Sequence, residues 1–156
     1  MIELARMAAF ISVLGTAIVY GTDAFCAMVL RPALAHVDDR SLVAVMGYVH
    51  RYGDRRMPVP GALGIVGAAA SAALAAVADR WLAAIAAGAA VGLLLVWLVL
   101  YVRVSAPINR QLTTAATTGA VPPNAQVLQR EWDRIITARA VLLGLATAAA
   151  CLALVI

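Results

Sequence analysis

An aspartate within the first apolar stretch is the residue whose type and position most clearly suggest chemistry. Asp23 interrupts an apolar run from Met7 to Leu30. If that run crosses a membrane, a charged carboxylate inside it costs about 2.5–3.5 kcal/mol even on lenient scales. We expect such a side chain to face the interior of a helix bundle and to act as an acid, a base or a ligand. The alternative is a carboxylate near enough to the membrane surface to reach water or Arg31.

Other polar side chains fall on the same helical stripe as Asp23. Ser12, Thr16 and Tyr20 precede it at intervals of three or four residues, and Cys26 follows, so all lie near one face of a helix. A polar stripe on an otherwise apolar helix predicts an internal pocket or a hydrated crevice. We therefore take Asp23 as a candidate catalytic residue and Tyr20 as a candidate substrate-binding residue.

A histidine and an aspartate four residues apart form the second candidate catalytic site. His50 and Asp54 would share one face of a continuous helix, where such a pair works as a general base with its orienting carboxylate or as part of a metal site. Gly53 can instead end the helix, which leaves a histidine at the mouth of the bundle beside a surface aspartate. With His36, two histidines and carboxylates match the ligand types of a non-haem iron site. No spacing requires one, so we assign no metal ligand and leave any cofactor unknown.

A tryptophan and an arginine lie on one helical side at the entrance to the last apolar stretch. Trp132 and Arg139 are seven residues apart in the sequence, which is close to two helical turns. Arg139 can extend its guanidinium to the membrane surface. Alternatively, it can form a structural ion pair with a carboxylate from the first loop.

Composition indicates which elements must position these residues. Hydrophobic residues make up 64% of the 156-residue chain, whereas soluble domains average about 45–50%. A soluble domain of this size cannot bury that much apolar surface. Four stretches reach the length of about 20 mostly apolar residues that a spanning helix needs. We therefore predict an all-α fold, with residues 1–156 forming a single four-transmembrane-helix bundle whose spans are Met7–Leu30, Pro60–Ala78, Trp81–Val102 and Ile135–Ile156.

The arginines predict the orientation of the bundle. All twelve basic residues are arginines; apart from Arg139, nine lie in the two long loops, and only Arg6 and Arg80 lie on the opposite side. The positive-inside rule then places both loops in the cytoplasm and both termini outside it, in a bacterial inner membrane. No signal-peptide cleavage site follows the first stretch, so we expect it to remain as a span. Without a basic stripe carrying interleaved aromatic residues, we expect no nucleic-acid partner.

The two long loops are predicted to contain helix. Apolar residues recur at helical spacing from Asp38 to Tyr52, which predicts an amphipathic helix capped by Asp39 or Ser41 and ended by Gly53. Its predicted apolar face comprises Leu42, Val45, Met46 and Val49, with Val43 and His50 adjoining. The last helix is expected to begin near Ala125 and therefore to project into the cytoplasm. Basic side chains of the amphipathic helix are expected to pair with acids of that projection, namely Arg51, Arg55 and Arg56 with Glu131 and Asp133.

Small residues at every fourth position predict that the helices pack closely, because such stripes let the backbones approach one another. The stripes are Gly64, Ala68, Ala72 and Ala76 in the second span, Ala84, Gly88 and Gly92 in the third, and Ala140, Gly144 and Ala148 in the fourth. Several enzyme classes lack their motifs. The chain has no glycine-rich phosphate loop, no nucleophile elbow and no Cys-x-x-Cys.

The exit from the third span resembles a known family. Pro107-Ile108-Asn109, then Trp132 and Arg139, together with Gly21 and the downstream Arg31-Pro32-Ala33-Leu34, resemble the anthrone-oxygenase-like family of small four-helix membrane proteins. The resemblance implies oxidation of a reduced polyaromatic to a quinone with dioxygen, without an obvious organic cofactor. It makes Asn109, Trp132 and Arg139 candidate substrate-binding residues. Pro107 and Asn109 can equally form the turn that ends a helix.

Two functions from different classes follow from these observations. The first is an oxygenase-like protein that binds an apolar aromatic or quinone-like molecule from the lipid in a pocket within the bundle. The second is a non-enzymatic accessory subunit that docks into a larger membrane complex or a homo-oligomer. A pocket lined by the candidate residues favours the first, and a filled core with a flat apolar face favours the second.

Overall fold

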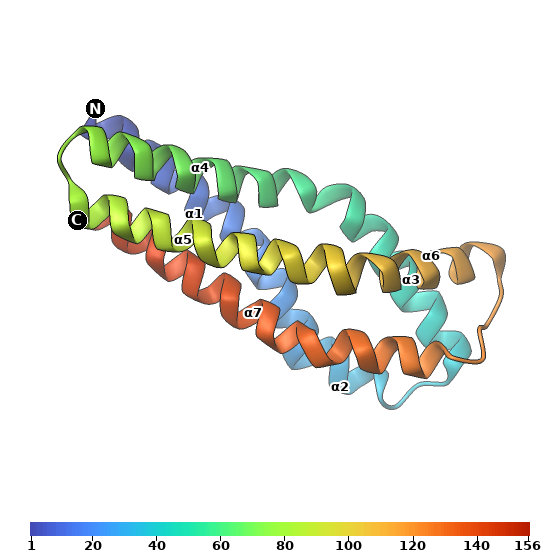
Figure 1. Cartoon of the computed structure of the whole chain (residues 1–156). Helices are drawn as coiled ribbons and strands as arrows, with labels where there is room; N and C mark the ends of the chain where they lie inside the picture. Colours follow the sequence, from blue (N-terminus) through green and yellow to red (C-terminus); the bar gives the residue numbers. More distant parts are fainter.

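Four long helical rods joined by short connections make up nearly the whole chain (Figure 1). The computed structural model describes all residues 1–156 and contains no strand. Two rods contain a π-helical turn, and one has a break between two α-helices. The first rod is α1 (Ile2–Phe25), η1 (Cys26–Leu30) and α2 (Arg31–Leu34); the second is α3 (Asp39–Arg56) and α4 (Pro58–Val77); the third is α5 (Trp81–Leu100), η2 (Tyr101–Ser105) and α6 (Ala106–Thr118); the fourth is α7 (Ala125–Val155).

Each rod carries a helix long and apolar enough to cross a membrane, and the chain is a multi-pass membrane protein. Helices α4 and α7 each pack against both α1 and α5, which closes a four-helix bundle. Both termini lie at one end, and α2, α3 and α6 lie at the other (Figure 1). The predicted all-α bundle is confirmed. The first and third helices extend beyond the predicted spans, to Leu34 and Thr118.

The contact between α1 and α4 depends on small residues. A Cβ added to Gly64 would lie 2.7 Å from Thr16 Oγ1, and one added to Gly67 would lie 2.8 Å from the Ala8 carbonyl oxygen. Ser12 Oγ donates a hydrogen bond of 2.8 Å to the Gly64 carbonyl oxygen. Ser12 and Thr16 are therefore used in helix packing. Only the end of the predicted polar stripe that carries Asp23 and Cys26 lines a cavity.

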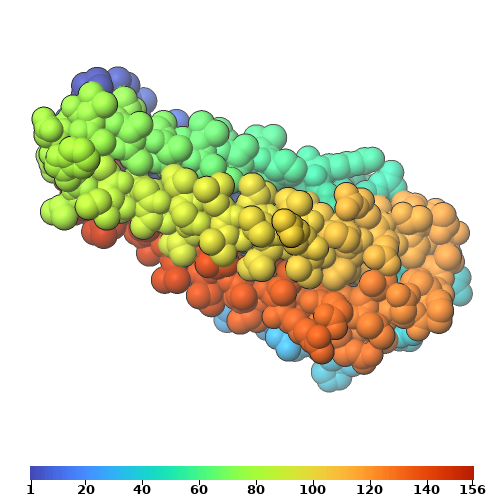
Figure 2. Space-filling model, viewed as in Figure 1, coloured from blue at the N-terminus to red at the C-terminus, as the bar shows by residue number.

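Two of the three residues in the small-residue stripe of the third span, Gly88 and Gly92, do not pack against a helix of this chain, whereas Ala84 packs against the cluster of Ala5, Ala75 and Ala83. Gly88 and Gly92 are exposed, and no atom lies within 4 Å of a Cβ built on either residue. The rods otherwise lie closely side by side, as the space-filling view shows for α4, α5 and α7 (Figure 2). Large apolar side chains such as Phe10, Val66 and Ile85 are exposed on the outside of the spans, where lipid would cover them.

Three of the four rods change their helical geometry just before a proline. The η1 turn ends two residues before Pro32, the η2 turn ends two residues before Pro107, and α3 meets α4 just before Pro58. A proline removes a backbone N–H and crowds the carbonyl of the preceding turn, and a wider π turn lets the helix continue through it. The alternative in which Pro107 and Asn109 end the third helix is therefore wrong, because α6 extends to Thr118.

The amphipathic helix predicted in the first loop is α3, with a different cap. Its first turn is capped by Asp38, whose carboxylate accepts a hydrogen bond of 2.9 Å from the backbone N–H of Ser41. The cap is therefore not Asp39 or Ser41. This hydrogen bond holds the pKa of Asp38 below its usual value, because it favours the charged carboxylate.

Helix α3 is also longer than predicted, and it buries only part of the predicted apolar face. It runs through Gly53 to Arg56, so the predicted end at Gly53 is wrong and one helix carries both His50 and Asp54. It packs against α6. Val45 and Val49 of the predicted apolar face are exposed; the residues actually buried are Leu42, Val43, Met46, Gly47 and His50.

Candidate functional site

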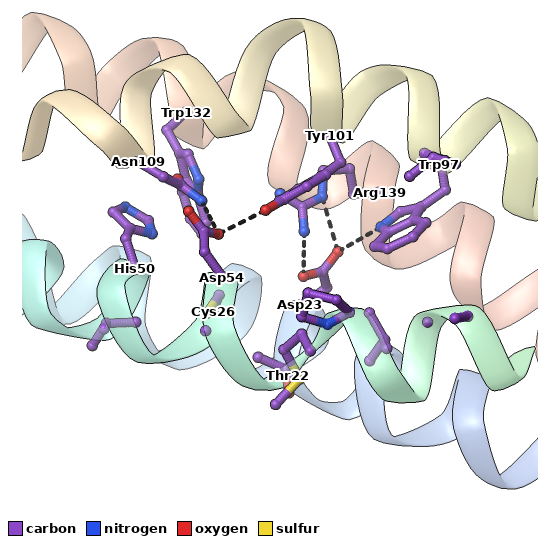
Figure 3. Close-up of a pocket in the computed structure, with 18 of the residues that line it drawn as sticks. Thr22, Asp23, Cys26, His50, Asp54, Trp97, Tyr101, Asn109, Trp132 and Arg139 are labelled. Atoms are coloured by element: carbon purple, nitrogen blue, oxygen red, sulfur yellow. Dashed lines mark hydrogen bonds and ion pairs between the residues drawn. The ribbon is translucent and has the colours of Figure 1, made fainter. Parts of the chain in front are cut away.

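A cavity of about 280 Å³ lies inside the bundle where η1, α3, α4, η2 and α7 come together (Figure 3). All four rods contribute to its lining, which is largely apolar and aromatic. Tyr20 is outside it, since its ring lies against Gly144 of α7 and the residue is 39% exposed. The other six candidate site residues all line the cavity: Asp23, His50, Asp54, Asn109, Trp132 and Arg139.

Asp23 and Arg139 form a buried ion pair at one end of the cavity. Arg139 Nη2 lies 2.8 Å from Asp23 Oδ1, and Arg139 Nε lies 3.0 Å from Asp23 Oδ2, a bidentate geometry. Trp97 Nε1 donates to Asp23 Oδ2 at 3.2 Å, and Arg139 Nη1 donates to Ser105 Oγ at 2.6 Å. The predicted inward direction of Asp23 is confirmed. Arg139 neither reaches the membrane surface nor pairs with a carboxylate of the first loop, because its partner belongs to the first span.

Aromatic rings surround the guanidinium of this ion pair. Arg139 Cζ lies 5.8 Å, 5.5 Å and 6.0 Å from the ring centroids of Trp97, Tyr101 and Trp132. A desolvated cation–π contact contributes about 2 kcal/mol, which helps to offset the cost of removing the charge from water. Hydrogen bonds occupy both carboxylate oxygens and all three guanidinium nitrogens. The ion pair is therefore complete without a ligand.

Asp54 connects α3 to the third rod. Its Oδ1 atom accepts hydrogen bonds from Tyr101 Oη and from Asn109 Nδ2, each 2.8 Å long. No hydrogen bond joins Asp54 to His50, although the two share a helix. The carboxylate thus orients an amide and a phenol of the cavity wall and leaves the imidazole free.

Three polar atoms at the other end of the cavity are buried without any hydrogen-bond partner. They are His50 Nε2, Asn109 Oδ1 and Trp132 Nε1, on residues only 4–5% exposed. The rings of His50 and Trp132 lie 5.3 Å apart, and Figure 3 shows the three side chains at the same side of the cavity. An unsatisfied buried polar atom costs about 1–3 kcal/mol, so three together indicate a place for a ligand. We call His50, Asn109 and Trp132 the open cluster.

Burial keeps the imidazole of the open cluster uncharged. Loss of hydration, and to a smaller extent the charge of Arg139, lowers the pKa of His50 from 6.5 to about 3. Both effects disfavour the imidazolium. His50 is therefore neutral at physiological pH, and its ring can accept a hydrogen bond or a proton.

Sequence reasoning did not identify three residues that complete the ion pair and its surroundings. Trp97, Tyr101 and Ser105 follow one another at intervals of four residues, and Asn109 continues the series. This stripe was a usable signal, because residues four apart share one face of a helix. It was hidden by the assumption that the third helix ends near Val102.

Suppose that the end of the bundle with the two termini lies at one surface of the membrane. The cavity then lies near the opposite surface. Asp23 follows Arg6 by about 26 Å of helix at 1.5 Å per residue, within a hydrocarbon layer about 30 Å thick. The ion pair is then just inside the hydrocarbon. His50 and Asp54, on a helix that is not itself a candidate span, are at or beyond its edge.

Comparison of the chain with family models, curated proteins and solved structures gives no match. Fold and site together define a class: a four-span helical membrane protein whose cavity combines a complete ion pair with an open hydrogen-bonding cluster. No group of three or more His, Cys, Asp and Glu side chains could hold a metal ion.

Proposed function

We propose that the cavity binds a small fused-ring aromatic of the anthrone type and supports its oxidation by dioxygen to the quinone. The open cluster carries this proposal. It presents a donor, an acceptor and a neutral imidazole inside an apolar, aromatic cavity. Ligand sites usually combine such a lining with a few placed polar groups, in volumes of about 300–1,000 Å³. A cavity of about 280 Å³ favours a small ligand.

The three polar atoms fit the functional groups of a hydroxylated anthrone. Trp132 Nε1–H can donate to the ring carbonyl, and Asn109 Oδ1 can accept from a phenolic hydroxyl. His50 Nε2 can then take a proton from the acidic methylene carbon opposite the carbonyl, acting as a general base, because the anion that forms beside it stabilises the imidazolium. The negative charge moves onto the carbonyl oxygen, where the Trp132 N–H stabilises it.

Dioxygen completes the reaction. The deprotonated ring carbon forms a bond to dioxygen and gives a peroxide, which takes back the proton held by His50. Cleavage of its O–O bond with loss of the remaining hydrogen of that carbon releases water and leaves a second ring carbonyl. One anthrone and one dioxygen thus give one quinone and one water, with carbon oxidised and oxygen reduced.

Oxygen uptake by the purified chain tests this proposal. We expect an anthrone in detergent micelles to consume one dioxygen per quinone formed, followed with an oxygen electrode and by quinone absorbance. His50→Gln should slow turnover by about 10²–10⁴-fold, the usual contribution of a general base, while leaving the melting temperature nearly unchanged. Tyr20→Phe, outside the cavity, is the control and should have wild-type rates.

Two results would contradict the proposal. Uptake that is equal with and without the protein would exclude catalysis. Failure of an anthraquinone to quench the fluorescence of Trp97 and Trp132 would exclude aromatic binding and favour the accessory subunit. A variant that keeps only Trp81, which is outside the cavity, gives the background signal for that measurement.

We also infer that both termini lie outside the cytoplasm of a bacterial inner membrane. The support is the arginine distribution, because nine arginines are at the end that carries α2, α3 and α6, against two at the terminal end. Thr117→Cys, on exposed α6, should resist a membrane-impermeant thiol reagent in intact cells, whereas a cysteine at position 1 should be labelled. The reverse pattern would invert the orientation.

A further inference from the structure

A second groove lies between α3 and α6, and Asp54 lines both this groove and the cavity. The volume of the groove is about 450 Å³, and none of its lining residues is hydrophobic. Three threonines of α6 form one wall, and three arginines border it. The lining residues are Arg51, Asp54, Arg55, Arg110, Thr113, Thr114 and Thr117.

The arginines of this groove lack partners within the chain. Arg51, Arg55 and Arg110 form no ion pair, no side-chain hydrogen bond and no cation–π contact, whereas Arg56 lies over the ring of Tyr52. The predicted pairing of the α3 arginines with Glu131 and Asp133 is wrong. Glu131 pairs with Arg134 at 2.8 Å, and Asp133 accepts from Gln129 at 2.9 Å.

The one acid of the groove is already engaged. Asp54 directs its Oδ1 atom to Tyr101 and Asn109 in the wall shared with the cavity. Three guanidinium groups therefore face a groove with at most one partly used carboxylate. Charges of one sign gathered along a groove raise the local concentration of ions of the opposite sign.

The position of the groove along the bundle matches a lipid headgroup layer. Counted from the Asp79–Arg80 turn at 1.5 Å per residue, Arg55 is about 36 Å away, Arg51 about 42 Å and Arg110 about 45 Å. A bilayer with its headgroups is about 40–45 Å thick. If the turn lies at one surface, the three arginines lie at the headgroups of the other.

We propose that this groove binds the phosphate of an anionic phospholipid headgroup. Guanidinium groups bind phosphate oxygens through paired, charge-assisted hydrogen bonds, and the hydroxyl of Thr114 or Thr117 can donate further ones. Basic pockets between helices at a membrane surface are the expected sites for anionic headgroups. The bound lipid would lie beside Asp54, which also lines the cavity.

Lipid binding by the purified, delipidated full chain tests the proposal. The probe is phosphatidylglycerol titrated into phosphatidylcholine nanodiscs, followed by native mass spectrometry and by the thermal unfolding midpoint. Replacing Arg51, Arg55 and Arg110 together by Gln should weaken phosphatidylglycerol binding roughly a hundredfold, at the usual contribution of each basic residue near a membrane surface. The matched control replaces Arg40, Arg103 and Arg130 by Gln. It loses the same charge outside the groove and should bind as the wild type does.

Each other outcome has a definite meaning. Equal weakening in both triple variants would show a general charge effect and overturn the groove. A midpoint shift produced equally by inorganic phosphate would assign the site to a soluble anion and overturn the lipid. If the triple variant fails to fold, Arg110→Gln alone should still weaken binding several-fold, and unchanged binding in that variant would contradict the proposal.

Discussion

The ion pair and the open cluster share one cavity but use hydrogen bonds in opposite ways. Every charged nitrogen and oxygen of Asp23 and Arg139 has a partner, whereas His50, Asn109 and Trp132 each keep one buried atom without any. An unpaired charge inside hydrocarbon is too costly to keep, whereas a neutral polar atom left unpaired costs about 1–3 kcal/mol. The charges therefore hold the helices together, and the neutral groups remain available to a ligand.

The largest expected effect comes from breaking the ion pair. Arg139→Leu leaves the Asp23 carboxylate buried and alone, and we expect it to lower the free energy of unfolding by about 3–5 kcal/mol. The double variant Asp23→Leu/Arg139→Leu should recover most of this loss, because neither charge then remains. Thermal unfolding in detergent measures both. Asp23→Leu should be destabilised for the same reason, because it leaves the Arg139 guanidinium buried without its carboxylate.

An exposed ion pair provides the control for this experiment. Arg134 pairs with Glu131 at 2.8 Å, with its side chain 72% exposed, and Arg134→Leu should change stability by less than about 1 kcal/mol. If the double variant of the buried pair is as unstable as Arg139→Leu, the ion pair is not the unit that holds these helices.

The same substitution in the two regions should give different results. Trp97→Phe removes an N–H that is bonded to the Asp23 carboxylate, and hydrogen bonds to charged groups contribute about 1.5–3 kcal/mol. Trp132→Phe removes an N–H that has no partner, so this variant loses only the packing of the larger ring. We expect Trp97→Phe to be the less stable protein in detergent unfolding. Equal losses of stability would mean that the Trp132 N–H has a partner, such as a bound water. Trp132 would then no longer belong to the open cluster.

Acid should weaken the fold through the open cluster. The pKa of His50 is about 3 in the folded protein and 6.5 when the ring is hydrated, so between these values the unfolded chain binds one more proton. The free energy of unfolding therefore falls as pH decreases below 6.5, by about 2 kcal/mol at pH 5. His50→Gln should remove this dependence, and His36→Gln, on an exposed residue, should retain it. Parallel pH curves for wild type and His50→Gln would refute the burial of a neutral imidazole.

Much of the fold could be predicted because it depends on local properties of the sequence. Apolar length identified four spans, and the Pro-Asn sequence before Ala125 placed the start of α7. Helix ends were less predictable. Pro107 and Gly53 are residues at which a helix can end, but a π turn and continued packing on α6 carry the helices through both. Since these ends decide which residues share a face, the errors at them hid the Trp97–Asn109 stripe.

The sequence identified candidate site residues wherever a residue type was unusual for the segment that contains it. A charge within a span and a histidine beside an apolar helix face are such cases, and Asp23 and His50 both line the cavity. Which side chains pair could not be predicted. The Asp23–Arg139 contact joins residues 116 positions apart in the chain, and no spacing rule connects the first helix to the last.

The π turn at Tyr101–Ser105 also sets the phase of the third rod. A π turn accommodates more residues than an α turn, and each residue of an α-helix advances the chain by about 100°. If the same residues were wound as an ordinary α turn, everything that follows would rotate by about that angle. Asn109 would then turn away from Asp54, and the threonines of α6 would leave their groove. A one-residue deletion within the π turn should restore ordinary winding and keep Asn109 and the threonines nearly in place, so it should be tolerated better than the same deletion in the α-helix on either side of the turn.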